Sequence, residues 1–212
     1  MLKEFKIVFW DFDGVIKDSL TVKTEGYAKL FLPFGEKVVE RIKQHHKANG
    51  GISRYDKIPL YLNWAGEPAE PNQVREYCDR FSNLVKQAVI DSPWVTGVQK
   101  YLESYHRRQF FVLITGTPQE EIEEILHSLK ITHYFQEVYG APKIKFEMVR
   151  NVLNRLQCPP EKALVVGDSS ADLEAAEKNN VAFLLRCTRI NLSLQEEFSG
   201  PRFEELKNES IK

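Results

Sequence analysis

The chain has 212 residues, of which 42% are hydrophobic and 28% charged, a composition typical of soluble globular proteins. The formal net charge of −1 excludes a global field that would attract nucleic acid or an anionic membrane. No apolar run approaches a transmembrane length, and Lys3, Glu4 and Lys6 interrupt any signal-peptide core. The three cysteines, Cys78, Cys158 and Cys187, form no CxxC pair, so we expect reduced thiols and a cytoplasmic protein.

The first predicted element is a buried strand, Phe5–Trp10, which ends at two aspartates. In "VFWDFDGVIKDS" the carboxyl groups of Asp11 and Asp13 are separated by one residue. Like charges this close repel each other unless a positive charge lies between them. The chain must therefore supply that charge or bind it.

The next stretch carries helical periods and no convincing strand. Between Asp18 and about Ser92 the clearest patterns are "EKVVERIKQHH" and "VREYCDRFSNLVKQAVI". We interpret residues 18–91 as an inserted helical domain, and residues 1–17 and 92–212 as one sheet domain. The adjacent histidines His45 and His46 point in different directions on a helix, so a solvated helix face is favoured over a metal site.

Strand and helix patterns alternate through the remainder of the chain. Four further apolar runs predict strands, and three amphipathic stretches between or after them predict helices. The alternation predicts a doubly wound parallel, Rossmann-like α/β sheet. The strands are Phe110–Ile114, Phe135–Tyr139, Ala163–Val166 and Val181–Leu185, and the helices are Gln119–Leu129, Phe146–Leu156 and Ala171–Asn179.

Polar motifs follow the first four of these strands. Since ligands of open α/β sheets bind beyond the carboxyl ends of the strands, the four loops should share one site. Three or four carboxylates with one lysine form a site for a hard cation such as Mg²⁺. The three later motifs are "TGTP" at 115–118, "GAPKIK" at 140–145 and "GDSSAD" at 167–172.

Such a site suits phosphoryl transfer. A cation and a lysine can neutralise the repulsion between an attacking carboxylate and a phosphate dianion, so that an aspartyl-phosphate can form. A second carboxyl group two residues away can act as general acid and then base. The backbone N–H groups of Gly116 and Thr117, at a helix N-terminus, can hold the phosphoryl oxygens.

In their order and spacing, the four motifs resemble those of the haloacid dehalogenase (HAD) superfamily, in which phosphatases and phosphomutases predominate. The resemblance implies that Asp11 is the nucleophile and Asp13 the acid/base, and that Thr115 binds the phosphate. It also implies a Mg²⁺ cofactor held by Asp11, the backbone carbonyl of Asp13 and Asp168.

Two further positions follow from the same resemblance. Asp172 is expected either to bind the metal directly or to hold the metal-binding residues in place through its carboxylate. The third-motif lysine is Lys143 or Lys145, and Lys145 is favoured because it opens the next predicted helix, as the family's lysine usually does.

The inserted segment resembles the helical cap of HAD members. Within it, "GGISRYDK" at 50–57 resembles the substrate-specificity loop of beta-phosphoglucomutase-like members, and Arg54 would then grip a second phosphate of the substrate. Arg54 and Lys57 are thus candidate substrate-binding residues, with solvated loop charges as the alternative. The fourth motif looks more like that of phosphoglycolate-phosphatase-like members.

The leading hypothesis is therefore a Mg²⁺-dependent phosphatase for a small phosphorylated metabolite. A phosphomutase is the alternative that Arg54 suggests, and a catalytically quiet HAD-like binding protein is the alternative from another class. A dehalogenase is disfavoured, because such members usually lack the second aspartate. We expect neither nucleic acid nor membrane as a partner, and a monomer or homodimer.

Overall fold

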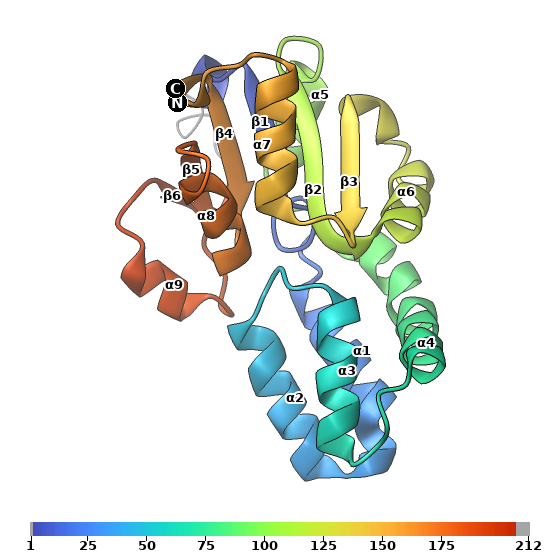
Figure 1. The fold of residues 1–212 in the computed structure, drawn as a ribbon. Coiled ribbons are helices and arrows are strands. Elements are labelled where there is room, and N and C mark those ends of the chain that lie inside the picture. Colours follow the sequence, from blue (N-terminus) through green and yellow to red (C-terminus); the bar gives the residue numbers. More distant parts are fainter. Residues whose placement is uncertain (1, 207–212) are drawn as a thin grey trace.

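The computed structural model describes residues 2–206. Over this range, six parallel strands form one sheet in the order β3-β2-β1-β4-β5-β6 (Figure 1). The predicted doubly wound α/β class is confirmed. The strands are β1 (Ile7–Trp10), β2 (Phe110–Pro118), β3 (Glu137–Ala141), β4 (Ala163–Gly167), β5 (Ala182–Arg186) and β6 (Arg202–Phe203).

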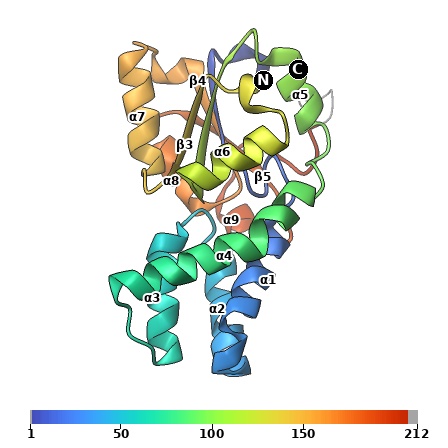
Figure 2. The same ribbon diagram turned by 90° about the vertical axis from the view of Figure 1, so that its right-hand side faces the viewer.

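Side chains of the central strands alternate between two cores, one on each face of the sheet. Val8 and Trp10 of β1 belong to the larger core, and Ile7 and Phe9 to the smaller one. Both faces are apolar because both are covered by helices, which is why the strands read as continuous hydrophobic runs. Figure 2 shows α5 (Val98–Tyr105) and α6 (Gln119–Ser128) on one face, opposite α7 (Lys145–Arg155) and α8 (Ser170–Glu177).

Between β1 and β2 the chain forms a helical cap beyond the carboxyl ends of the strands (Figure 1). Stacked and edge-on aromatic rings fill the cap, including Tyr27 against Phe81 with ring centroids 4.0 Å apart. The long α4 carries the chain back to the sheet domain (Figure 2). The helices are α1 (Leu20–Phe31), α2 (Glu36–Ala48), α3 (Arg54–Ala65) and α4 (Pro71–Asp91).

The cap departs from the sequence expectation at its specificity segment. The segment 50–57 was expected to be a loop, but α3 already begins at Arg54, so Arg54 and Lys57 lie on its first turn. The Ser53 hydroxyl caps this helix by accepting a hydrogen bond from the backbone N–H of Tyr55. Pro59 lies inside α3, and a proline within a helical pattern ordinarily signals a break.

Smaller differences lie in the sheet domain. The third strand is displaced by two residues toward the C-terminus from its predicted position, and α5 has no counterpart among the predicted helices. After β5 the chain adds α9 (Leu192–Glu197) and the edge strand β6. Short 3₁₀ turns occur at Leu2–Glu4, Leu32–Phe34, Thr132–Tyr134 and Pro160–Lys162.

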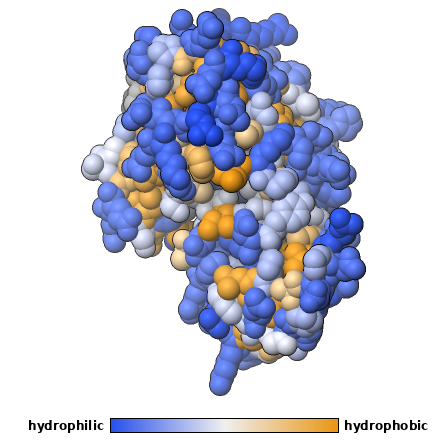
Figure 3. Space-filling model, in the orientation of Figure 1, coloured by the Kyte–Doolittle hydropathy of each residue, from blue (hydrophilic) through white to orange (hydrophobic). Residues whose placement is uncertain are grey.

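The described surface is largely hydrophilic on the face drawn in Figure 3, and apolar side chains gather on it where the cap meets the sheet domain. Within residues 2–206, none of the helices has the length and apolar character that crossing a membrane requires.

Candidate active site

The end of β1 places two carboxylates at the junction of cap and sheet. Asp11 and Asp13 are both buried there. Gly14, which follows them, has a φ of +78°, in the left-handed region that glycine tolerates. A Cβ atom at Gly14 would lie 2.5 Å from Oδ2 of Asp168, so the glycine also lets the loop after β4 approach the end of β1.

Three of the predicted carboxylates form one buried cluster with the third-motif lysine. Oxygen atoms of Asp11, Asp168 and Asp172 lie within 4.8 Å of one another. Nζ of Lys145 lies 3.1 Å from Oδ1 of Asp11 and 2.7 Å from Oδ1 of Asp172. Lys143 does not join them, because its Nζ lies over the ring of Tyr139. The geometry thus brings Lys145 to the cluster.

The cluster retains an excess of negative charge. Burial raises the pKa of Asp11 and, still more, that of Asp168, and the neighbouring carboxylates add to the rise. Burial alone would lower the pKa of Lys145, but the carboxylates of Asp11 and Asp172 raise it. One ammonium cannot neutralise three carboxylates, so the cluster favours a bound cation.

The three carboxylates differ in how many hydrogen bonds they already accept from other residues of the protein. Asp172 accepts hydrogen bonds from Lys145 on Oδ1 and from the Ser169 hydroxyl on Oδ2, so it is suited to positioning the lysine. Asp11 accepts from the backbone N–H of Phe12 and faces Lys145 with the same oxygen, Oδ1. Among the described residues, none donates a hydrogen bond to the Asp168 carboxylate. Asp11 and Asp168 are therefore the side chains with oxygens available to a hard cation such as Mg²⁺.

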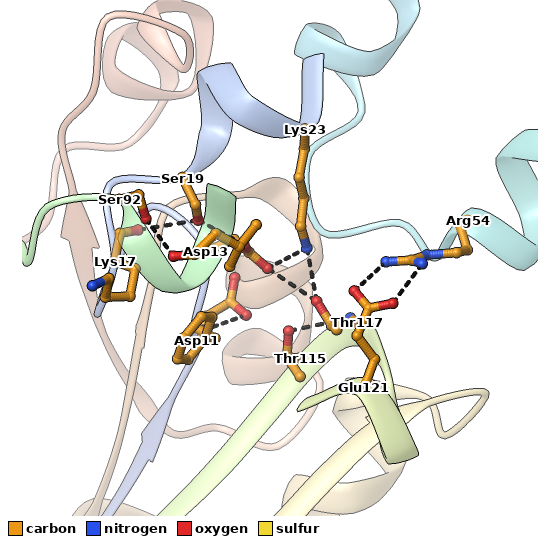
Figure 4. A network of polar contacts seen from close by, with 12 residues as sticks. Asp11, Asp13, Lys17, Ser19, Lys23, Arg54, Ser92, Thr115, Thr117 and Glu121 are labelled. Atoms are coloured by element: carbon orange, nitrogen blue, oxygen red, sulfur yellow. Dashed lines mark hydrogen bonds and ion pairs between the residues drawn. The ribbon is translucent and has the colours of Figure 1, made fainter. Parts of the chain in front are cut away.

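Asp13 lies apart from the cluster in a hydrogen-bond network of its own (Figure 4). The Ser19 hydroxyl donates to Oδ1 at 2.6 Å, and the Thr117 hydroxyl donates to Oδ2 at 3.1 Å. The Lys23 ammonium, from α1 of the cap, also pairs with Oδ2. Burial would raise the pKa of Asp13, but the Lys23 ammonium and these hydrogen bonds lower it below its ordinary value.

The segment at the end of β2 forms the opposite wall. Thr115 and Thr117 are buried, and the Thr115 hydroxyl accepts a hydrogen bond from the backbone N–H of Thr117 at 3.2 Å. Gly116 lies directly under the cap, since a Cβ there would be 2.7 Å from the carbonyl oxygen of Gly51. All three residues line the cavity that also contains Asp11.

This cavity, of about 270 Å³, lies between cap and sheet domain. Its size suits a small ligand. From the cap it is lined by Lys23, His46, Arg54 and Lys57 among others, and from the sheet domain by Asp11, Asp13, Thr115 and Asp168. Arg54 is bound to Glu121 of α6 (Figure 4), whereas Lys57 contacts Nδ1 of His46 at 3.1 Å.

Most of the sequence candidates line this cavity, and Lys145 and Asp172 contact Asp11 or each other without lining it, whereas Lys143 lies elsewhere. The structure adds three residues. His46 was expected on a solvated helix face but lines the cavity beside Lys57. The sequence patterns do not identify Lys23 or Glu121 as site residues, because nothing in their local sequence distinguishes them from surface charges. Ser19 precedes the first residue of α1. Had this helix start been predicted from the sequence, Lys23 would have been placed on the first turn of α1, close in sequence to Asp13.

Comparisons with known proteins show which sequences and folds this chain resembles. The model of the haloacid dehalogenase-like hydrolases matches residues 8–185. The phosphorylated carbohydrates phosphatase of Thermotoga maritima is 25% identical over 187 residues, covering 82% of this chain and 81% of that protein. The phosphoglycolate phosphatase of Vibrio cholerae is 26% identical over 186 residues, covering 83% of this chain and 81% of that protein.

Among solved structures, beta-phosphoglucomutase from Clostridium difficile superimposes with a TM-score of 0.76. The match covers 98% of this chain and 95% of that chain, with 19% sequence identity. At this identity the likeness concerns the fold alone, the sheet domain together with its helical cap.

Proposed function

The chain belongs to the haloacid dehalogenase-like hydrolase family, and we propose that it is a Mg²⁺-dependent phosphatase that hydrolyses a small phosphorylated metabolite. The observation that carries the proposal is the buried carboxylate cluster with its single lysine, facing the Thr115–Thr117 wall across the cavity between cap and sheet domain. The relatives named as phosphatases support the same reaction class.

In this proposal Asp11 attacks the phosphorus atom and forms an aspartyl-phosphate, since its carboxylate is buried at the cavity wall. Asp13 is the proposed acid/base. The Lys23 ammonium keeps its carboxylate ionised, so the proton that Asp13 donates to the leaving oxygen must reach Oδ2 when substrate binding displaces Lys23. Asp13 afterwards takes a proton from the water that attacks the aspartyl-phosphate, which releases inorganic phosphate and frees Asp11. The Thr115 hydroxyl and the N–H groups of Gly116 and Thr117 hold the phosphoryl oxygens.

Lys145 supplies a fixed positive charge beside Asp11, and Asp172 holds that lysine in position. The available oxygens of Asp11 and Asp168, together with the backbone carbonyl of Asp13, would hold Mg²⁺. When bound, the metal ion would offset the repulsion between the carboxylates and the phosphate dianion.

The helical insertion, with proposed boundaries at residues 18 and 91, would act as a cap that excludes bulk water from the phosphoryl group. The cavity volume of about 270 Å³ supports a small metabolite as the substrate. We propose a cytoplasmic location and no nucleic-acid or membrane partner, in line with the near-neutral charge.

The phosphomutase alternative relied on Arg54 as the group that grips a second phosphate. Because both terminal nitrogens of Arg54 are bonded to Glu121, this support for a mutase is weakened, and hydrolysis is the favoured reaction.

The test is hydrolysis of p-nitrophenyl phosphate by the purified protein with and without metal. We expect activity with Mg²⁺, its loss in excess EDTA and its recovery when Mg²⁺ is restored. Full activity in excess chelator would refute the metal requirement, and no activity under any of these conditions would refute the phosphatase.

A further inference from the structure

The Arg54 guanidinium is fully engaged by other residues of the chain. Nη1 and Nη2 donate to the two carboxylate oxygens of Glu121, each at 2.7 Å, in a bidentate ion pair. Ser82 of α4 bonds to both partners, and the guanidinium lies over the ring of Phe81 at 4.6 Å from its centroid. Figure 4 shows the pair beside Thr117, joining α3 of the cap to α6 of the sheet domain.

This pairing cancels the charge that Arg54 would offer to a ligand. Arg54 and Glu121 are exposed by only 3% and 6%, so water screens their attraction weakly. A second phosphate on the substrate would have to displace Glu121 and leave its carboxylate buried without a partner, which is strongly unfavourable. Arg54 therefore serves the contact between cap and sheet domain.

Lys57 is in the opposite situation. Its side chain is exposed by only 2% and lines the same cavity, and among residues 2–206 it forms no ion pair. Its hydrogen-bonding contact is the uncharged ring nitrogen Nδ1 of His46. Two other lysines line the cavity: Lys23 is already paired with Asp13, and Lys47 is exposed to solvent. A buried ammonium without a counter-charge is an anion site that the protein itself leaves open.

We propose that Glu121 is a selectivity residue that withholds Arg54 from the substrate, and that Lys57 with His46 binds the far end of the substrate, a singly charged group such as a carboxylate. This inference rests on the proposed phosphatase function and narrows its substrate class to phosphate monoesters of small hydroxy acids. Lys57 is the lysine of this cavity that is both buried and without an ion pair among the described residues, and its single charge matches one negative charge, whereas a second phosphate dianion would remain half compensated.

Three substrates of equal carbon number test the charge of the far group. Glycerol 3-phosphate ends in a neutral hydroxyl, 3-phosphoglycerate in a carboxylate, and glycerol 1,3-bisphosphate in a second phosphate. With Mg²⁺ present, we expect kcat/KM to be highest for 3-phosphoglycerate, by about tenfold or more over each of the other two. Lys57→Met should abolish the preference for 3-phosphoglycerate over glycerol 3-phosphate.

Glu121→Gln frees the guanidinium of Arg54. It should raise kcat/KM for the bisphosphate relative to glycerol 3-phosphate by about tenfold. The matched control is Glu124→Gln, which breaks the exposed ion pair between α6 and Lys86 of α4, another contact of the cap with the sheet domain. That control should leave the substrate ranking unchanged.

A double variant keeps the test decisive if Glu121→Gln fails to fold. Arg54→Met with Glu121→Leu replaces the ion pair by apolar side chains, a change that buried pairs often tolerate. Since Arg54 does not contact the substrate in our proposal, this variant should retain the wild-type ranking. A selective loss of 3-phosphoglycerate hydrolysis in the double variant would show that Arg54 binds substrate, and would overturn the proposal.

Two further results would also overturn it: a wild-type protein that prefers the bisphosphate, or a Lys57→Met variant that keeps its preference for the carboxylate. In both cases hydrolysis of p-nitrophenyl phosphate would still support the phosphatase. A protein that hydrolyses none of the four esters would overturn the proposed function, and this inference with it.

Discussion

At the scale of single residues, the buried charges around the cavity fall into two groups. The charges of Asp13 and Arg54 are matched by bonded partners. Asp168 and Lys57 have no such partner among the described residues, although both line the cavity. An unpaired buried charge is costly, so chains ordinarily avoid it unless a ligand completes the pair. The unmatched residues therefore indicate where a cation and an anionic group would bind.

The proposed nucleophile gives the first prediction. Asp11→Asn should lower kcat for p-nitrophenyl phosphate by on the order of 10³-fold or more, because an amide is a far poorer nucleophile than a carboxylate. The same substitution removes one of the mutually repelling carboxylates, so the metal-free variant should unfold at the same or a higher temperature than the wild type. Turnover close to the wild-type value would rule out an aspartyl-phosphate on Asp11.

The second prediction concerns how much the buried ammonium group of Lys57 destabilises the folded protein. Burial lowers the pKa of Lys57 to about 7 from its ordinary 10.5. Between these values the unfolded chain binds more protons than the folded protein, so the free energy of unfolding rises with pH. Below about pH 7 Lys57 is charged in both states, and the cost is present in full. The charged and titratable groups that act on it are His46 of α2, Lys23 of α1, Asp168 after β4 and Asp56.

Lys57→Met should therefore raise the Tm of the metal-free protein, and by more at pH 6 than at pH 9. Thermal unfolding followed by circular dichroism at both pH values measures the difference. Lys47→Met is the control, since Lys47 is exposed at the mouth of the same cavity, and it should change the Tm little at either pH. A gain that is equal at both pH values would contradict the pKa assigned to Lys57.

At the scale of elements, the loop between α2 and α3 brings the backbone of the cap directly against the sheet domain. Gly51 between α2 and α3 lies against Gly116 near the end of β2 and against the start of α8, where a Cβ on Gly51 would be 2.4 Å from Oγ of Ser169. The glycines of this loop thus allow the cap to lie directly on the motifs that surround the cavity.

Gly116→Ala tests this contact. The added Cβ would lie 2.7 Å from the Gly51 carbonyl oxygen, so the cap loop must move away. We expect kcat/KM to fall by about 10- to 100-fold for every substrate, because the cap is displaced relative to the phosphate-binding segment and no longer positions the substrate correctly. Gly50→Ala is the milder control, as its Cβ would meet nothing nearer than Cβ of Ser169 at 3.2 Å. Wild-type kinetics in Gly116→Ala would show that the contact is dispensable.

At the scale of the whole molecule, the site exists only where the cap and the sheet domain meet. The sheet domain supplies the carboxylates and Lys145, whereas the cap supplies Lys23, His46 and Lys57. The ion pair of Arg54 with Glu121, and that of Lys86 with Glu124, join the two parts at one side of the cavity. A change in the position of the cap would therefore change which side chains surround the cavity.

Metal binding should stabilise the whole molecule. At a Mg²⁺ concentration about 100 times its Kd, we expect the Tm to rise by roughly 5–10 °C, because the cation binds the folded state and relieves the repulsion between carboxylates. Differential scanning calorimetry with and without Mg²⁺ measures the shift. Asp168→Asn should abolish most of it. An unchanged Mg²⁺ shift in that variant would remove Asp168 from the proposed metal ligands.

The sequence by itself determined the sheet class and the places where polar loops leave the strands. These follow from local patterns: apolar runs that end in Asp11 and Asp13, and a lysine, Lys145, that opens a helix. Because parallel strands align their carboxyl ends, residues far apart in sequence could be assigned to one edge. Tertiary structure alone decided that Glu121 holds Arg54, that Lys23 pairs with Asp13 and that the buried Lys57 forms no ion pair with another described residue. These contacts join side chains from separate elements, and their partners depend on how cap and sheet pack together, which no local spacing encodes.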